Sequence, residues 1–146
     1  MCWMNSTFEQ ELSKNGRLIF TNVGDSMWPL IIEGRDLIII EKCDLPLKKY
    51  DIPLYKRDSG QYVLHRILKV KKGGYVLCGD NRATREYGIC DRHILGKLTG
   101  IIRNGRQVNL NGLKYKIYTH LWCDFYFLRA LIIKIYGKIK RYAKIK

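Results

Sequence analysis

Acidic residues are nearly absent from the last third of this 146-residue chain. Residues 92–146 contain 13 lysines and arginines but one acid, Asp124, whereas residues 1–91 contain 14 basic and 12 acidic residues. Almost all of the net charge of +14 therefore lies in the C-terminal part. A segment of this charge suits nucleic acid or anionic lipid, and charge alone does not choose between the two.

The chain also lacks the cysteine and histidine patterns of a disulfide framework or a metal site. Its five cysteines are odd in number, widely spaced and without a Cys-x-x-Cys pair. Cys78 and Cys90 flank one loop and could form a bridge if oxidised, but buried thiols are the favoured interpretation. Three scattered histidines predict no metal site, and we expect no cofactor.

A targeting segment is missing from the beginning of the sequence. Residues 1–5 do not provide a basic segment followed by a long apolar run, so we predict neither a signal peptide nor an N-terminal membrane span. Together with the cysteine usage, this favours a cytoplasmic location, with peripheral attachment to the cytoplasmic face of the membrane as a second option.

The hydrophobic pattern predicts one mainly β domain with helices at both ends. Residues 1–16 are expected to form a short helix, with a capping box at Ser6–Glu9 and an end at Asn15-Gly16. Residues 17–112 contain many short apolar segments separated by turns, which is typical of an antiparallel barrel or sandwich. The expected strands are 17–21, 36–40, 52–56 (an edge strand or an irregular piece because of Pro53), 62–70, 75–78, 94–103 and 107–110, and residues 82–92 are expected to be irregular.

Residues 113–146 form the basic tail, and its second part has helical periodicity. Apolar residues recur at alternating steps of four and three from position 121 onward: Leu121, Phe125, Leu128, Ile132, Ile135 and Ile139. One long amphipathic helix is therefore predicted. It could lie on anionic lipid, with aromatic residues at the headgroups (Trp122, Tyr126, Tyr136 and Tyr142), or pack on the β domain with a solvated basic face.

The segment with the most chemical content is Gly24-Asp25-Ser26-Met27-Trp28-Pro29. Gly24 permits the backbone angles of a tight turn, and Pro29 restricts the residue before it. The pattern predicts that Ser26 sits on a stiff turn between strands. Taken alone, Gly-Asp-Ser is more often an ordinary turn than a reactive site.

A reactive serine needs a base, and His65 is the best candidate because it lies in a strand-like segment among apolar neighbours. Such a histidine needs a carboxylate that fixes its tautomer. Asp80, at the end of the next strand, is the first choice, and Glu86 and Asp91 are alternatives. His93 and His120 have less strand-like settings and are expected to be surface or structural residues.

Four segments in order resemble the conserved boxes of the signal peptidase I superfamily, which also contains the self-cleaving SOS and phage repressors. They are Gly24–Pro29, Leu64-His65-Arg66-Ile67, Gly79-Asp80-Asn81-Arg82 and Gly96-Lys97, and the resemblance spans about residues 17–103. It implies a coiled antiparallel β domain in which a peptide lies as an extra strand. His65 makes the chain similar to the histidine type of the superfamily.

The resemblance implies a role for each matched residue. Ser26 would be the nucleophile, His65 the general base and Asp80 the orienting acid, with the Ser26 N–H in the oxyanion site. Gly24, Met27 and Pro29 would shape the turn and the substrate groove. The implied activity is serine-type endopeptidase cleavage of a leader or signal-like peptide.

Other functions remain open at the level of sequence. The chain could be a non-catalytic β domain that binds peptides, nucleic acid or membrane, as a repressor-like regulator would. Nucleic acid is the less favoured partner, because only one short helix precedes the serine, where a repressor has a whole DNA-binding domain. The expected partners are a peptide or protein substrate and an anionic membrane surface contacted by residues 121–146.

Overall fold

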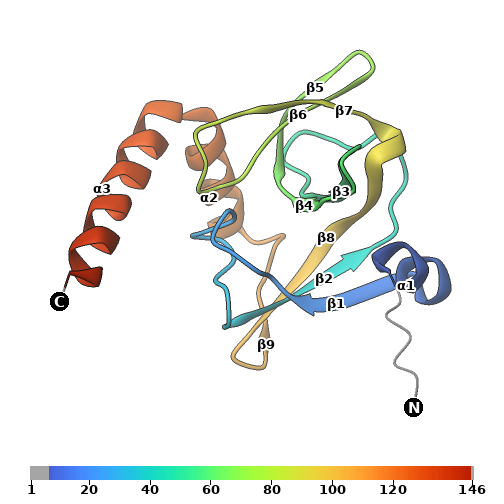
Figure 1. Ribbon diagram of the computed structural model, residues 1–146, viewed down its shortest axis with the longest axis horizontal. Coiled ribbons are helices and arrows are strands. Elements are labelled where there is room, and N and C mark those ends of the chain that lie inside the picture. The colour runs from blue at the N-terminus through green and yellow to red at the C-terminus, as the bar shows by residue number, and fades with distance from the viewer. Residues whose placement is uncertain (1–6, 146) are drawn as a thin grey trace.

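The computed structural model describes residues 7–145, which form two antiparallel sheets with helices at both ends (Figure 1). The helices are α1 (Phe8–Asn15), α2 (Leu113–Asp124) and α3 (Tyr126–Lys144), with a single 3-10 turn at Asp91–His93. The strands are β1 (Arg17–Thr21), β2 (Asp36–Glu41), β3 (Pro53–Lys56), β4 (Tyr62–Leu64), β5 (Arg66–Lys71), β6 (Gly74–Cys78), β7 (Glu86–Ile89), β8 (Ile94–Arg103) and β9 (Arg106–Gln107). The predicted mainly β class is confirmed.

Helix α1 begins one residue later than the predicted capping box. Thr7 is the N-cap: its side chain accepts from the Gln10 N–H, and the Gln10 side chain accepts from the Thr7 N–H. Thr7-x-x-Gln10 satisfies the same chemical rule as Ser6-x-x-Glu9, which leaves Glu9 free to bind Lys56 and Tyr62. Ser6 itself lies outside the described residues. The helix ends as predicted, at Gly16 with φ +68°.

The larger sheet has the order β1-β2-β8-β3-β4, and β9 pairs with β8. The ten-residue β8 pairs with both β2 and β3, and the register shifts once in each pairing, which bends the sheet. Of the two options predicted for the strand with Pro53, the edge position is wrong, because β3 lies between β8 and β4; its pairing with β8 is irregular at Leu54/Tyr55. Pro53 is tolerated as the first residue of its strand.

His65 interrupts the continuous strand predicted for residues 62–70. Leu64 pairs with Leu54 in the larger sheet, whereas Arg66 pairs with Cys78 in a second sheet of order β5-β6-β7. The histidine therefore sits where the chain crosses from one sheet to the other. Strand β7 lies between the predicted strands 75–78 and 94–103, where the sequence pattern predicts no strand, and it pairs with β6.

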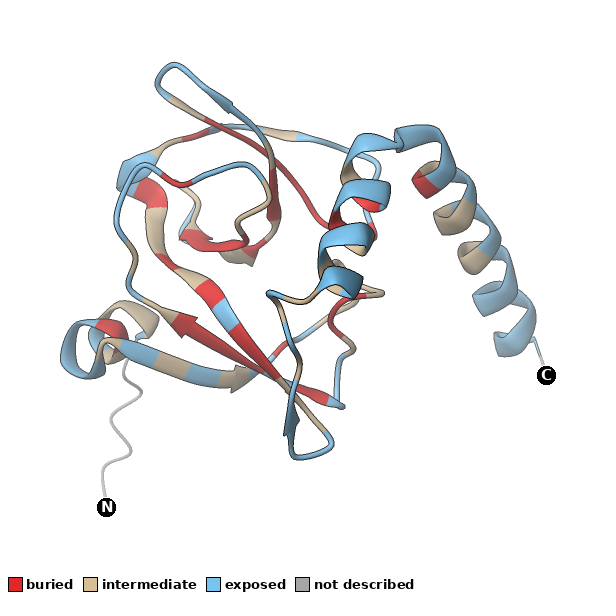
Figure 2. Ribbon diagram, turned by 180° about the vertical axis from the view of Figure 1, so that it is seen from behind, coloured by how far each residue is buried: buried red, intermediate tan, exposed pale blue. Residues whose placement is uncertain are grey.

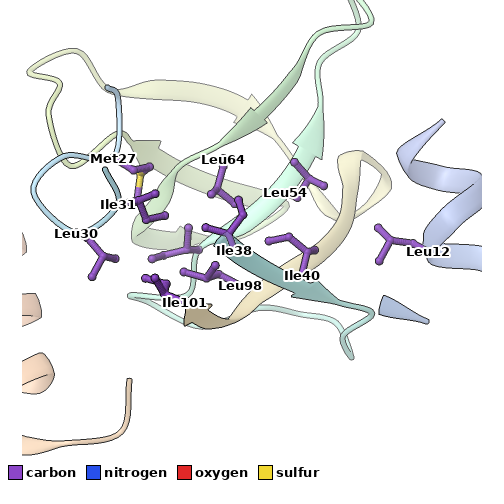
Figure 3. Close-up of a cluster of buried hydrophobic side chains, with 11 residues drawn as sticks. Leu12, Met27, Leu30, Ile31, Ile38, Ile40, Leu54, Leu64, Leu98 and Ile101 are labelled. Atoms are coloured by element: carbon purple, nitrogen blue, oxygen red, sulfur yellow. The ribbon is translucent and has the colours of Figure 1, made fainter. Parts of the chain in front are cut away.

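A buried apolar cluster joins the larger sheet to the serine-containing turn (Figure 3). Met27, Leu30 and Ile31 come from the turn and pack with residues of the sheet: Ile38, Ile40, Leu54, Leu64, Leu98 and Ile101. A second cluster lies under the smaller sheet and includes Tyr55, Ile67 and Leu77. The side chains of Met27, Leu30 and Ile31 thus anchor the serine turn in the core.

The tail contains two helices instead of the single long one predicted. Helix α2 already begins after the N-cap Gly112, and the helical conformation is interrupted at Phe125 (φ −104°, ψ 71°). Asp124, the last residue of α2, binds the Lys49 ammonium and the Tyr50 hydroxyl, which fastens the interruption to the β domain. No helix of the described residues is long and apolar enough to cross a bilayer.

Candidate functional site

Ser26 lies half-buried on a turn that is fixed at both ends. Gly24 has φ +87°, a conformation that suits glycine, and the Asn22 side chain donates to the Gly24 carbonyl at 3.2 Å. The Trp28 N–H donates to the Asp25 carbonyl at 3.1 Å, and the next peptide bond, Trp28–Pro29, is cis. The predicted stiff turn is therefore present.

Met27 and Pro29 have different surroundings on this turn. Met27 is completely buried in the core, where it holds the turn, and it does not line the pocket next to the turn. Pro29 lines an apolar pocket of about 700 Å³ together with Leu30, Tyr115 and Tyr118. A groove next to the turn is therefore formed by Pro29 but not by Met27.

The loop after β6 brings the serine turn to His65. The Asn81 N–H donates to the Ser26 carbonyl at 2.8 Å, and the Arg82 guanidinium binds the Asp25 carboxylate at 2.8 Å. A Cβ atom on Gly79 would lie only 2.6 Å from the Ser26 carbonyl oxygen and 3.1 Å from His65 Cδ2. Glycine is therefore required at position 79, where the backbone carbonyl of Ser26 and the His65 ring both approach the chain closely.

The other side of the imidazole faces a tyrosine and a glutamate. The Tyr55 hydroxyl donates to Glu86 Oε2 at 2.6 Å and lies 3.2 Å from His65 Nδ1, and Glu86 Oε2 is 3.6 Å from Nδ1. Because the Tyr55 O–H donates to Glu86, the Tyr55 oxygen can accept a hydrogen bond from Nδ1–H. This arrangement favours the tautomer that carries hydrogen on Nδ1. The lone pair is then on Nε2, which is bonded to Cδ2, the ring atom that lies near Gly79.

Burial lowers the pKa of His65 to about 4, although the nearby Glu86 carboxylate acts in the opposite direction. Arg57 and Arg82 also disfavour the imidazolium. Burial alone would raise the pKa of Glu86, but hydrogen bonds from Arg57 and Tyr55 bring it below its ordinary value. At neutral pH the site therefore contains a neutral imidazole beside an ionised carboxylate.

Acidification from the ordinary histidine pKa of 6.5 to the folded value of about 4 is expected to destabilise the protein. In this range the unfolded chain binds a proton on His65 and the folded chain does not, so the free energy of unfolding falls with falling pH by about 2 to 3 kcal/mol in total. Urea unfolding across this range measures the slope.

The control for this slope is His65→Gln, which should make the curve flatter in the same range. Glu9 and Asp124, whose pKa values are lowered to about 2, lose their stabilising contributions only at more acidic pH. Equal slopes for the wild type and the variant would show that His65 titrates normally.

Asp80, the first choice for the orienting acid, does not contact the histidine. Its two carboxylate oxygens accept from Arg66 Nε at 2.9 Å and Nη2 at 2.8 Å, and the Tyr118 hydroxyl adds a third bond at 2.7 Å. Both Arg66 and Asp80 are completely buried. The Asp80 carboxylate thus binds Arg66 and Tyr118 and forms no hydrogen bond with His65, so it does not orient the imidazole; only its charge affects the histidine, and it acts to raise the pKa of His65.

Of the two alternative acids, Glu86 lies at the site and Asp91 does not. Asp91 accepts a hydrogen bond from Tyr75, whose other partner is the Leu47 N–H, at the far end of the smaller sheet. The sequence analysis missed Tyr55 and Arg57, which position Glu86; Arg57 binds both carboxylate oxygens, at 2.6 and 2.7 Å. Tyr55 lies in β3 and Arg57 directly follows it, but nothing in the sequence indicates that this strand passes His65.

The remaining histidines have structural contacts. His93 is buried, accepts from the Cys90 N–H and lies 3.2 Å from Asp58. His120 lies between Tyr50 and Asp124 on the surface. Neither is near the serine turn.

A polar hollow opens beside His65 with a volume of about 490 Å³. It is bounded by Glu86 and Tyr87 of β7, which is an edge strand of the smaller sheet, and by the side chains of three arginines: Arg57, Arg82 and Arg85. An extended chain could lie here along the free edge of β7 and reach the imidazole.

Helix α3 covers the outer side of the serine turn. The Tyr136 ring stacks on the Trp28 ring with centroids 3.9 Å apart, and the Lys140 ammonium lies 3.3 Å from the Asp25 carboxylate. The buried Arg129 donates to the carbonyls of Gly79 and Arg82, on the loop that contacts Ser26. The tail therefore supports the geometry of the site.

Comparisons of the chain with models of protein families, with curated proteins and with solved structures find no match.

Proposed function

We propose that the protein is a serine endopeptidase in which Ser26 is the nucleophile and His65 the general base. The observation that carries this proposal is that the Ser26 backbone carbonyl and His65 Cδ2 both lie against Gly79, which puts the serine turn next to the imidazole. The order of four motifs along the chain and the antiparallel β domain also support a catalytic domain of the signal peptidase I type.

In the first step the Ser26 hydroxyl oxygen attacks the scissile carbonyl carbon while His65 Nε2 takes the hydroxyl proton. The negative oxygen of the tetrahedral intermediate needs donors. Within residues 7–145 the Ser26 N–H donates to no backbone carbonyl, so it is free to bind the oxyanion. Nε2–H then protonates the leaving amine, the C–N bond breaks, and an acyl-enzyme remains.

In the second half of the reaction a water molecule attacks the acyl carbon and His65 Nε2 removes its proton. The ester bond to Ser26 then breaks, and Nε2–H returns the proton to the serine oxygen, which releases the carboxylic acid product. The Tyr55–Glu86 pair accepts from Nδ1 throughout and stabilises the imidazolium that forms in each half. The substrate would be an extended peptide lying along β7, with the apolar pocket at Pro29 available for a side chain.

A fluorophosphonate probe tests this proposal because it reacts only with an activated serine. We expect covalent labelling of the wild type and none of Ser26→Ala, with the mass increase located on the peptide that contains Ser26. Ser59→Ala is the matched control, since Ser59 is an exposed turn residue far from His65 in the fold.

Two results would contradict the proposal. One is undiminished labelling of Ser26→Ala, and the other is complete resistance of the folded wild type to the probe. The second result would favour a β domain that binds peptides in the same groove without cutting them.

A further inference from the structure

We infer that α3 docks the protein on an anionic lipid bilayer through the side of the helix that points away from the β domain. Figure 2 shows α3 as a largely exposed helix at the edge of the molecule. The inference concerns this surface only and does not depend on catalysis at Ser26.

The inner side of α3 is already occupied. Arg129, Tyr136 and Lys140 follow one another at helical spacings of seven and four, and all three contact the β domain. The orientation of the helix is therefore fixed, and its opposite side cannot turn inward.

One side of the helix that faces away from these contacts is apolar. We call it the outer apolar face, and it consists of residues at steps of three and four: Leu128, Leu131, Ile135, Ile139 and Tyr142. Their side chains are 47, 54, 49, 60 and 74% exposed, respectively. Such a continuous apolar surface marks an interaction site. Five of the six residues of the stripe noted in the sequence are exposed, which excludes that stripe as the packing face.

The charge of α3 indicates which partner covers the outer apolar face. Lys134, Lys138 and Arg141 flank the outer apolar face, and within residues 7–145 none of the three forms an ion pair. The helix contains no acidic residue. A second copy of this helix would therefore meet only like charges. Nucleic acid would pair with the basic residues but leave the apolar face in water, whereas an anionic bilayer accommodates both.

Two of the aromatic residues expected at the headgroups have other roles. Trp122 is buried and donates to the Asp80 carbonyl, and Tyr136 stacks on Trp28. Exposed aromatic side chains are found instead at the two ends of α3, where Phe127 and Tyr142 are 88 and 74% exposed. Both ends of the helix can thus enter the interfacial region.

Docking in this way would place the serine turn near the membrane. A helix with its side chains is about 10 Å across, and Trp28 and Asp25 contact the inner side of α3. If the proposed peptidase function is correct, the substrate would be a peptide at the membrane surface. Only this statement about the substrate rests on the proposed peptidase function.

Cosedimentation of the full chain with vesicles tests the inference. We expect binding to vesicles of phosphatidylcholine mixed with phosphatidylglycerol, little binding to phosphatidylcholine alone, and release by salt. Leu131→Asp combined with Ile135→Asp should weaken binding about tenfold or more, because two exposed apolar contacts are lost without any change in the core. Lys138→Glu combined with Arg141→Glu should have a similar effect.

Matched controls lie on the β5–β6 hairpin. Val70→Asp changes an apolar side chain that is 42% exposed, and Lys69→Glu with Lys72→Glu reverses the same number of charges; neither should alter binding. Ser26→Ala should bind as the wild type does, so loss of catalysis and loss of docking are separate results. Circular dichroism confirms that each variant is folded.

Three outcomes would overturn the inference. Equal recovery of the wild type in the supernatant with both kinds of vesicle excludes a lipid surface. A dimer in light scattering that Leu131→Asp dissociates, without vesicle binding, assigns the face to a second copy. Retention by duplex DNA that depends on Lys138 and Arg141, again without vesicle binding, assigns it to nucleic acid.

Discussion

Replacing Asp80 by asparagine is expected to lower the free energy of unfolding by about 3 to 5 kcal/mol. The substitution preserves the shape of the side chain but removes the charge that compensates Arg66, and both groups are completely buried. An uncompensated guanidinium in the core is far more costly than the loss of one hydrogen bond. Tyr118 also loses the acceptor that fastens α2 to the β domain.

Denaturant unfolding of Asp80→Asn measures this effect. Asp58→Asn is the control, because the ion pair of Asp58 with Arg92 is 2.9 Å long but lies on the surface, where such pairs add little stability. If Asp80 supported the histidine instead, the variant would keep its stability and lose reactivity at Ser26. A structural role of Asp80 therefore predicts a loss of stability, whereas a role in supporting His65 predicts a loss of reactivity without a loss of stability.

The sequence was sufficient for the parts of the fold that depend on local patterns. The end of α1 at Gly16 and the last turn at Asn104-Gly105 require particular backbone angles, and both residues of that turn have positive φ. The β2 segment is a continuous β-branched run. Each of these three features is determined by residues that are close together in the sequence.

The parts that could not be predicted depend on contacts between distant segments. The break at His65 exists because Leu64 and Arg66 pair with different sheets, although the alternation through residues 62–70 is typical of one strand. Phe125 likewise interrupts the tail where Asp124 is bound by Lys49. Local periodicity contains no information about either partner.

In the candidate site, too, some residues could be predicted from local patterns and others depend on contacts between distant segments. Ser26 and His65 could be selected because a glycine-bounded turn and a strand histidine have recognisable settings. The acid could not, because Asp80 and Glu86 both follow β6, and only the approach of Arg66 from β5 shows which carboxylate is already bound. Tyr55 enters the site through the pairing of β3 with β4, which no spacing in the sequence reveals.

Replacing His65 by glutamine is expected to slow fluorophosphonate labelling of Ser26 by about 10² to 10⁴-fold, the usual contribution of a general base. Glutamine is similar in size but cannot accept the serine proton and release it again. For the wild type, the second-order rate constant of labelling should rise with pH as His65 loses its proton around pH 4 and should be level at neutral pH. His120→Gln is the control, because this exposed histidine lies beside Tyr50 and Asp124.

Glu86→Gln should reduce the labelling rate less than His65→Gln does, because the base remains but its imidazolium loses the facing carboxylate. The pH profile separates a positioning role from simple damage to the fold. Glu86 acts to raise the pKa of His65, so its neutralisation should move the acid limb of the profile to lower pH while the plateau falls. A lower plateau with an unmoved limb would mean that Glu86 acts only through the packing of Arg57 and Tyr55. An unchanged profile in His65→Gln would exclude His65 as the base.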